Sequence, residues 1–298
     1  MGNKLVVKSN SLVEASYSLS VAEFRLLQMV FSEVSKFDDS YGFLPNHEFR
    51  VFAKDYANIF GVDISTAYEA LQDATNRIFH RYFTYERVYA KPDKIEVVNS
   101  RWVQKVAYSK ENGHISMQLT TDVMDMVGKL KNCFTKYKIK QISNLTSIYA
   151  LRLYELIIQW ASAKKTPIFE IQEFREKLGV DPNEYSRMFD YVLDLAVKQI
   201  NENTDIQVKY EQHKHGRTIY GFSFNFVQIK DSDTPERDPN TRDWVEEEDS
   251  GSPVADVQAL LKKMTNSKPE KKKRKVITQQ QAELLARVGE SWDDLLER

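Results

Sequence analysis

The sequence predicts an α+β fold of two tandem winged-helix domains, with a largely disordered C-terminal tail. One observation is a repeat: much of residues 169–181 matches residues 51–63, with apolar residues aligned and Gly-Val-Asp unchanged. A second is that each copy reads as helix, tight turn and helix, the helix-turn-helix pattern. A third is the hairpin pattern after each copy, with Gly113 and Gly216 in the turns.

The composition allows two packed domains and a remainder. The chain has 298 residues, 42% of them hydrophobic, and ordinary domains have about 100–150 residues. Its single cysteine, Cys133, excludes a disulfide framework and suits a reducing cytosol. No apolar run approaches the roughly 18 residues of a membrane span, so we expect a cytoplasmic protein without a membrane partner.

Each element of the first half follows from local spacing. Apolar residues recur at helical spacing after Ser18 or Ser20, and either serine can cap that helix. Asn112 and Gly113 mark the turn of an alternating hairpin, which completes the first winged helix. The expected elements are a strand at 5–10, helices at 21–37, 53–60 and 65–83, hairpin strands at 95–109 and 114–120, and a helix with a basic connector at 121–140.

The second half repeats this order and ends in a charged tail. Ser143 and Asn144 are the expected cap of its first helix. Between residues 231 and 249 the chain carries nine acids, two bases and two prolines, a composition typical of disorder. The expected elements are a helix at 145–161, a strand and helix within 167–180, a recognition helix at 181–201 and a hairpin at 205–226.

The domain boundaries follow from these elements. The predicted domains are the first winged helix at 1–130, a basic connector at 131–142, the second winged helix at 143–230, and a mostly disordered tail with short helices at 231–298. We expect the first domain to dimerise and to add auxiliary DNA contacts. The second is expected to provide the main DNA readout.

The recognition helix of the second copy holds the first candidate DNA-binding residues. In a helix-turn-helix the second helix enters the major groove, and side chains near its start reach the base edges. An arginine such as Arg187 can bind guanine through two hydrogen bonds. A solvated helix is the alternative, because Asp190 and Asp194 share its outward face. The candidates on this helix are Asn183, Tyr185, Ser186, Arg187 and Lys198.

Basic residues in the two wings form the second group of candidates, because wing tips contact phosphates or the minor groove. An ordinary solvated turn is the alternative. The charge balance is modest for a DNA-binding protein, with 19 basic and 16 acidic side chains in residues 1–141 and 11 of each in 142–230. The candidates are Lys209, His213, Lys214 and Arg217 in the second wing and Lys105 and Lys110 in the first.

The first hairpin is apolar enough to serve as a dimer surface. Strands that only cover the local core would show the same pattern, and the sequence leaves both interpretations open. A second copy of the chain is therefore an expected partner beside double-stranded DNA. The candidate dimer residues are Val97, Trp102, Val103 and Val106.

Enzyme motifs are mostly missing. The chain lacks the Gly-x-x-x-x-Gly-Lys-Ser/Thr motif that holds a nucleotide phosphate, and we expect no cofactor. The alternative is a metal-dependent nicking enzyme of the rolling-circle type, in which His213 and His215 bind metal and Tyr210 or Tyr220 is the nucleophile. Such an enzyme needs both histidines on a strand facing one metal, whereas this pair is expected at a hairpin tip. We therefore expect neither a metal site nor catalysis.

Taken in order, these segments resemble the replication initiator (Rep) proteins of iteron-carrying, theta-replicating plasmids, whose fold is two tandem winged helices. The resemblance covers about residues 4–229. No single segment is a catalytic signature, and the order and spacing over most of the chain make the match specific. The matching segments are KSNSLVEASYSLSVAEFRLL, YANIFGVDISTAYEAL, SIYALRLYELIIQW, VLDLAVKQINENTDIQVKY and GRTIYGFSFNF.

The resemblance implies an initiator that binds DNA and is not an enzyme. Monomers of the family bind directly repeated iterons in double-stranded origin DNA, help to open the neighbouring AT-rich DNA, and recruit host initiation factors and helicase. Dimers, formed mainly through the first winged helix, bind an operator inverted repeat and repress the rep gene. The second winged helix supplies most base contacts, which map here onto Tyr185, Ser186 and Arg187, supported by Lys214 and Arg217.

One departure from the family pattern concerns the recognition helix. Only Phe189, Asp190 and Tyr191 separate Tyr-Ser-Arg-Met from Val-Leu-Asp, so the chain is about three residues short and lacks a basic segment there. Three residues are nearly one helical turn, so the later face of the helix rotates by roughly 60° relative to its start. This leaves a further alternative, an initiator-derived protein-interaction module with weakened DNA binding.

Overall fold

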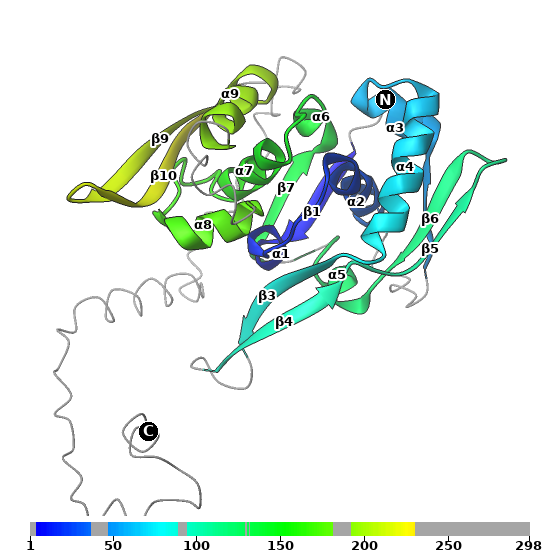
Figure 1. Cartoon of the computed structure of the whole chain (residues 1–298), viewed down its shortest axis with the longest axis horizontal. Helices are drawn as coiled ribbons and strands as arrows, with labels where there is room; N and C mark the ends of the chain where they lie inside the picture. Colours follow the sequence, from blue (N-terminus) through cyan, green and yellow to red (C-terminus); the bar gives the residue numbers. More distant parts are fainter. Residues whose placement is uncertain are drawn as a thin grey trace, which may run out of the picture. The chain divides into compact units, whose positions relative to one another are not determined.

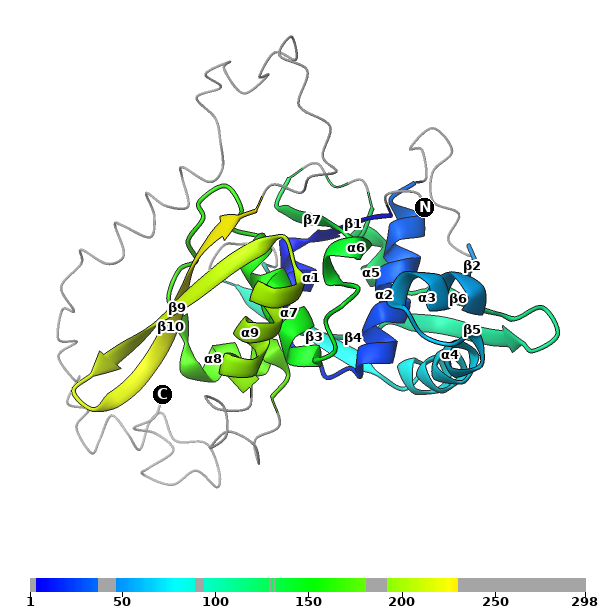
Figure 2. The same cartoon turned by 90° about the horizontal axis from the view of Figure 1, so that it is seen from above.

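The computed structural model describes residues 4–36, 47–88, 94–128, 130, 132–180 and 192–229. Both helix-turn-helix copies lie within one unit, Met1–Thr234 (Figure 1 and Figure 2). The tail expected to be disordered, 231–298, falls outside the described residues, so its disorder stays a prediction.

The first winged helix is delimited by local signals. Its elements are β1 (Leu5–Ser9), α1 (Asn10–Glu14), α2 (Val21–Val34), β2 (Phe49–Phe52), α3 (Ala53–Phe60), α4 (Ile64–Ile78), β3 (Tyr82–Val88), β4 (Ile95–Arg101), β5 (Val103–Ser109), β6 (His114–Leu119) and α5 (Thr121–Asp125). Ser20 accepts a hydrogen bond from the Glu23 N–H at 3.3 Å, and the Glu23 carboxylate accepts one from the Ser20 N–H at 2.5 Å, so a capping box starts α2. Gly61 ends α3 with a φ of 65°, a conformation that favours glycine.

The expected strand at 95–109 is two strands that separate at Trp102. β4 pairs with β3, whereas β5 pairs with β6, which also pairs with β2. Trp102 is only 1% exposed, and its ring centroid lies 5.0 Å from that of Tyr17 and 4.5 Å from that of Phe83. Burying this indole removes a large apolar surface from water, which favours the change of sheet at this residue.

Strand β3 corrects the expectation of a helix through residue 83. The helix α4 ends at Ile78 and the strand begins at Tyr82. Phe83 and Tyr85 are buried while Tyr82 and Glu86 are exposed, the period-two pattern of a half-buried strand. Pairing with β4 and burial of the two aromatic rings decide the conformation here, because helix propensity is a weak preference that tertiary packing overrides.

The basic connector contains a strand, for which the sequence predicted no regular element. β7 (Phe134–Lys138) pairs antiparallel with β1, and α6 (Ile139–Ile142) follows it. Thr135 and Tyr137 are buried, whereas Lys136 between them is exposed. The N-terminal strand is thereby joined to the segment that leads into the second winged helix.

The second winged helix repeats the first, with a different cap on its first helix. Its elements are α7 (Ile148–Ile158), β8 (Phe169–Glu170), α8 (Ile171–Leu178), α9 (Asp194–Asn203), β9 (Ile206–His215) and β10 (Thr218–Gln228). Because α7 begins after Ser147, Ser143 and Asn144 are not its cap, contrary to expectation. Instead the side-chain oxygen of Gln199 on α9 accepts hydrogen bonds from the N–H groups of Thr146 and Ser147, both at 3.1 Å.

The two wings have the expected hairpin form. β9 and β10 form an antiparallel pair, with β8 on the other side of β10. Gly113 and Gly216 occupy the turns with φ values of 60° and 62°, as the sequence predicts. Both views show the β9–β10 wing and the β5–β6 wing projecting from opposite ends of the described residues (Figure 1 and Figure 2).

A buried charge cluster joins the N-terminal strand to α7. The carboxylate of Glu155 pairs with the ammonium of Lys8 and, at 3.2 Å, with the guanidinium of Arg152. The Tyr137 hydroxyl donates a hydrogen bond to the same carboxylate. Burial lowers the pKa of Lys8 to about 8, because removing the ammonium from water disfavours it more than Glu155 favours it.

We predict that Lys8→Met lowers the free energy of unfolding by about 3–5 kcal/mol, because it leaves the buried carboxylate of Glu155 with one partner fewer. The matched control is Lys4→Met, since Lys4 is partly exposed and lies 3.5 Å from the partly exposed Glu33. That control is expected to cost less than about 1 kcal/mol. Urea unfolding followed by circular dichroism measures both, and equal small effects would contradict the role given to the cluster.

Candidate nucleic-acid interface

The second wing carries basic side chains on both of its faces. Lys209, Lys214 and Arg217 are exposed. Alternate residues of a strand share a face, so Lys214 is on the face of the buried Ile206 and Val208, and Lys209 is on the opposite face. Among the described residues, Lys214 and Arg217 have no carboxylate partner. Their charges are therefore available to phosphates, which protein–DNA contacts commonly use for positioning.

A cross-strand row adds a cation that the sequence reasoning missed. Lys165 forms a bridge opposite Asn225 of β10, and Asn225 is paired with Lys209 of β9. Directly paired residues point to the same face, so Lys165 and Lys209 belong to one row across the sheet. The available signal was the Lys164-Lys165 pair just before the second repeat copy.

The histidine pair lies beside the turn of the hairpin, as expected, but both residues belong to the end of strand β9. β9 extends to His215, so His213 and His215 share one face. The Nε2 atom of His213 is 2.8 Å from the Ser223 hydroxyl, and the His215 ring stacks on Tyr220 with centroids 4.1 Å apart. Across the residues that the structure describes, no group of three or more His, Cys, Asp or Glu side chains is placed to hold a metal.

The described part of the expected recognition helix is α9, which packs beside β9. Tyr210 of the wing donates a hydrogen bond to Asp194 at 2.6 Å, which ties α9 to β9. Lys198 is exposed and lies 4.0 Å from Glu202, so a carboxylate one turn away competes for its charge. Four expected base-reading residues lie outside the described residues, namely Asn183, Tyr185, Ser186 and Arg187.

The two candidate lysines of the first wing differ in their surroundings. The ammonium of Lys105 is 2.5 Å from the carboxylate of Glu48, whose pKa it lowers by hydrogen bonding and by its charge. Lys110 lies in the β5–β6 turn, where its carbonyl accepts a hydrogen bond from the Gly113 N–H at 3.3 Å and its side chain is exposed. A DNA phosphate that contacts Lys105 therefore has to compete with Glu48 for its ammonium. The exposed ammonium of Lys110 is easier for a phosphate to reach.

The outward face of α4 is acidic. Glu69 and Asp73 are exposed on it. Arg77 is exposed as well, and its guanidinium pairs with the Asp73 carboxylate at 2.9 Å. Exposed carboxylates repel phosphates, so this face is unfavourable for contact with DNA.

The four candidate dimer residues divide between core and surface. Trp102 and Val103 are each 1% exposed, and Val106 is half-buried against the core. Trp102 and Val103 therefore fill the interior, which corrects their assignment to a dimer surface. Val97 is 65% exposed on β4, and its neighbour Ile95 is 60% exposed. The exposed apolar surface lies on the β3–β4 hairpin, which the sequence reasoning had not separated from the wing.

Two helix-turn-helix units in tandem, each followed by a hairpin with exposed cations, are the geometry of a winged-helix DNA-binding protein. None of the helices in the described ranges is long and apolar enough to span a membrane.

Comparison with known families identifies the kind of winged-helix protein. Residues 5–158 match the family model described as initiator replication protein, WH1, and residues 170–226 match the one described as initiator Rep protein, WH2. The chain therefore belongs to the Rep3 family of replication initiators. Members of this family are DNA-binding initiators and not enzymes, so the nicking alternative does not apply.

Individual proteins are similar to the chain in sequence or in fold. A replication initiation protein of Escherichia coli is 22% identical over 226 residues, which cover 73% of this chain and 67% of the relative. An uncharacterized 27.6 kDa protein of Escherichia coli is 27% identical over 235 residues, covering 74% and 95%. The crystal structure of the Pi initiator protein in complex with iteron DNA shares the fold, with a TM-score of 0.63 and 20% identity over 78% of this chain and 100% of that one.

We predict that Lys214→Ala weakens binding to DNA of any sequence and reduces the salt dependence, the slope of log K against log salt, by about 1. Lys105→Ala is the matched control, because Glu48 already neutralises much of that charge. It is expected to change the slope by less. Fluorescence anisotropy with a labelled duplex at several salt concentrations measures both slopes, and equal changes would contradict the distinction.

Proposed function

We propose that this protein binds directly repeated iterons in double-stranded origin DNA as a monomer and thereby starts replication of its plasmid in the cytoplasm. The observation that carries the proposal is the presence of both family domains in one unit, each with a wing whose cations are exposed. The shared fold with the Pi initiator, a protein solved in complex with iteron DNA, supports it.

The proposed mechanism uses binding energy and no bond chemistry. Base contacts from Asn183, Tyr185, Ser186 and Arg187 select the iteron, and Lys198 adds to this helix. Phosphate contacts from the wings hold the protein in register, which is the usual role of contacts to the DNA backbone. Assembly on neighbouring repeats then strains the AT-rich duplex, and the complex recruits host initiation factors and helicase.

We also propose that a dimer of the chain binds an operator inverted repeat and represses its own gene. The support is the β3–β4 hairpin, in which β4 pairs with β3 along one edge, and no other strand of the described residues pairs with its second edge. Val97 and Ile95 on this strand expose apolar side chains. A free strand edge beside apolar side chains is a template for pairing with a second copy.

We predict that the protein shifts a duplex containing the direct repeats beside its gene and leaves a scrambled duplex of equal length unshifted at moderate salt. Base contacts discriminate between the two, whereas phosphate contacts do not. An electrophoretic mobility assay at several salt concentrations is the measurement. Equal affinity for both duplexes would overturn sequence-specific initiation and would favour the protein-interaction module. In that case a basic three-residue insertion after Tyr191 is expected to restore DNA affinity.

We predict that Val97→Glu shifts the chain toward monomer, because it places a charge in the apolar surface of the proposed dimer. Sedimentation velocity over a range of concentrations measures the change. Tyr108→Glu is the matched control. Tyr108 is 53% exposed on β5, which is an edge strand of the β2–β6–β5 sheet. A dimer that persists in Val97→Glu and dissociates in Tyr108→Glu would place the interface on β5 instead.

A further inference from the structure

The segment that follows α1 connects the first winged helix to the second. Ser16 exchanges two backbone hydrogen bonds with Thr84 of β3, at 2.8 and 2.9 Å. Its hydroxyl donates a third to the Glu176 carbonyl of α8 at 3.2 Å. This one residue therefore contacts a strand of the first winged helix and the first helix of the second helix-turn-helix.

Arg152 on α7 fastens the same segment to the end of α8. Its guanidinium donates hydrogen bonds to the Lys177 carbonyl at 2.6 and 3.0 Å and to the Ala15 carbonyl at 2.9 Å. It also donates to the Tyr17 hydroxyl and lies 3.9 Å from the centre of the Tyr17 ring. A planar guanidinium has donors fixed in direction, so this pattern holds the three segments at one geometry.

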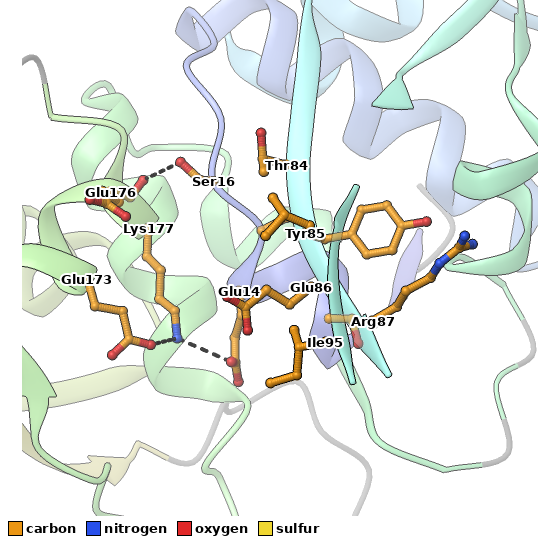
Figure 3. A pocket seen from close by; sticks show the side chains of 13 residues that line it. Glu14, Ser16, Thr84, Tyr85, Glu86, Arg87, Ile95, Glu173, Glu176 and Lys177 are labelled. Atoms are coloured by element: carbon orange, nitrogen blue, oxygen red, sulfur yellow. Dashed lines mark hydrogen bonds and ion pairs between the residues drawn. The ribbon is translucent and has the colours of Figure 1, made fainter. Parts of the chain in front are cut away.

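The side chain of Lys177 adds a charged contact between α8 and the N-terminal segment. Its ammonium lies 3.2 Å from the Glu14 carboxylate, on the N-terminal segment, and 2.7 Å from that of Glu173, on its own helix. Figure 3 shows Lys177 between these two carboxylates, with Ser16 directed toward Glu176. These residues line a cavity of about 640 Å³ beside β3.

The turn of the second helix-turn-helix packs directly on this segment. Gly179 has a φ of 69°, and a Cβ atom placed on it would lie 2.5 Å from the Tyr17 carbonyl oxygen. Gly61 holds the equivalent place in the first copy with a φ of 65°, and nothing lies within 4 Å of its Cβ position. The two glycines share one turn conformation, but only Gly179 is also required by a contact between the winged helices.

We propose that this junction acts as a ruler: Gly179, Arg152 and residues 14–18 fix the distance and angle between the two winged helices, and so select the spacing of the DNA segments that each contacts. The proposal rests on the proposed function and adds a specificity determinant to it. One base pair moves a contact by about 3.4 Å along the duplex and rotates it by about 35°, since one turn of 34–36 Å holds 10–10.5 base pairs. A fixed junction cannot follow such a shift, whereas a flexible linker can.

The test compares spacing preference, which a purely structural junction would not control. A hydroxyl-radical footprint of the wild type on one repeat locates the two protected tracts, and duplexes with one base pair inserted or deleted between them are then made. We expect wild-type affinity to fall about tenfold on either altered duplex, equivalent to about 1.4 kcal/mol. For Gly179→Ala we expect this penalty to fall below about threefold, because the added methyl group forces the turn away from Tyr17.

Gly61→Ala is the matched control, since it places the same residue at the same φ without an interdomain contact. It is expected to keep the wild-type penalty. If Gly179→Ala lacks a cooperative thermal transition, the double variant Glu14→Gln, Ser16→Ala takes its place, with Glu173→Gln as control. Glu14 and Glu173 share the partner Lys177, but only Glu14 reaches it from the N-terminal segment.

Two results would overturn the ruler while leaving the initiator function intact. One is a wild type that binds all three spacings with equal affinity. The other is a folded junction variant that keeps the full wild-type penalty. A wild type that does not prefer the repeat over scrambled DNA is a separate observation, and it removes the proposed function together with the ruler.

Discussion

The structure depends on the burial of one carboxylate. Glu155 is fully buried, and a buried charge must be paired and hydrogen-bonded, because its transfer from water costs several kcal/mol. Its partners come from β1 through Lys8, from β7 through Tyr137 and from α7 through Arg152. Bringing these segments together compensates the cost of burying the charge. In this arrangement the Arg152 guanidinium donates hydrogen bonds to the carbonyls of Ala15 and Lys177, which joins the N-terminal segment to α8.

The two copies of the repeat have different surroundings. In the first copy the turn at Gly61 is open and the outward face of α4 is acidic, with Asp73 occupied by Arg77. In the second copy the turn at Gly179 packs against Tyr17, and the adjoining wing carries Lys214 and Arg217, which have no carboxylate partner within the described ranges. The same Gly-Val-Asp turn is thus open to solvent in the first copy and packed against the N-terminal segment at Tyr17 in the second. The assignment of auxiliary contacts to the first domain and of base reading to the second stays a prediction.

Much of the fold was predictable because its signals are local. The capping box at Ser20, the limits of α3 and the hairpin turns at Gly113 and Gly216 depend on residues a few positions apart. The strands β3 and β7 and the separation at Trp102 were missed because their pairing partners lie elsewhere in the chain. For the candidate interface, the sequence predicted which residues are basic but did not predict which of them lie near a carboxylate. Proximity to Glu48 and Glu202 distinguishes Lys105 and Lys198 from Lys214, and no sequence spacing between Lys105 and Glu48 indicates that contact.

The sequence by itself determined that this chain holds two winged helices of the replication-initiator type, because periodicity, caps and turn glycines act over a few residues and each copy carries them in the same order. Only the tertiary structure decided which copy of the turn is open, which apolar residues of the first hairpin are exposed and whether Lys105 lies beside a carboxylate. Those properties arise from contacts between segments far apart in the chain. The repeated Gly-Val-Asp turn looks the same in both copies until the carbonyl of Tyr17 lies beside one of them.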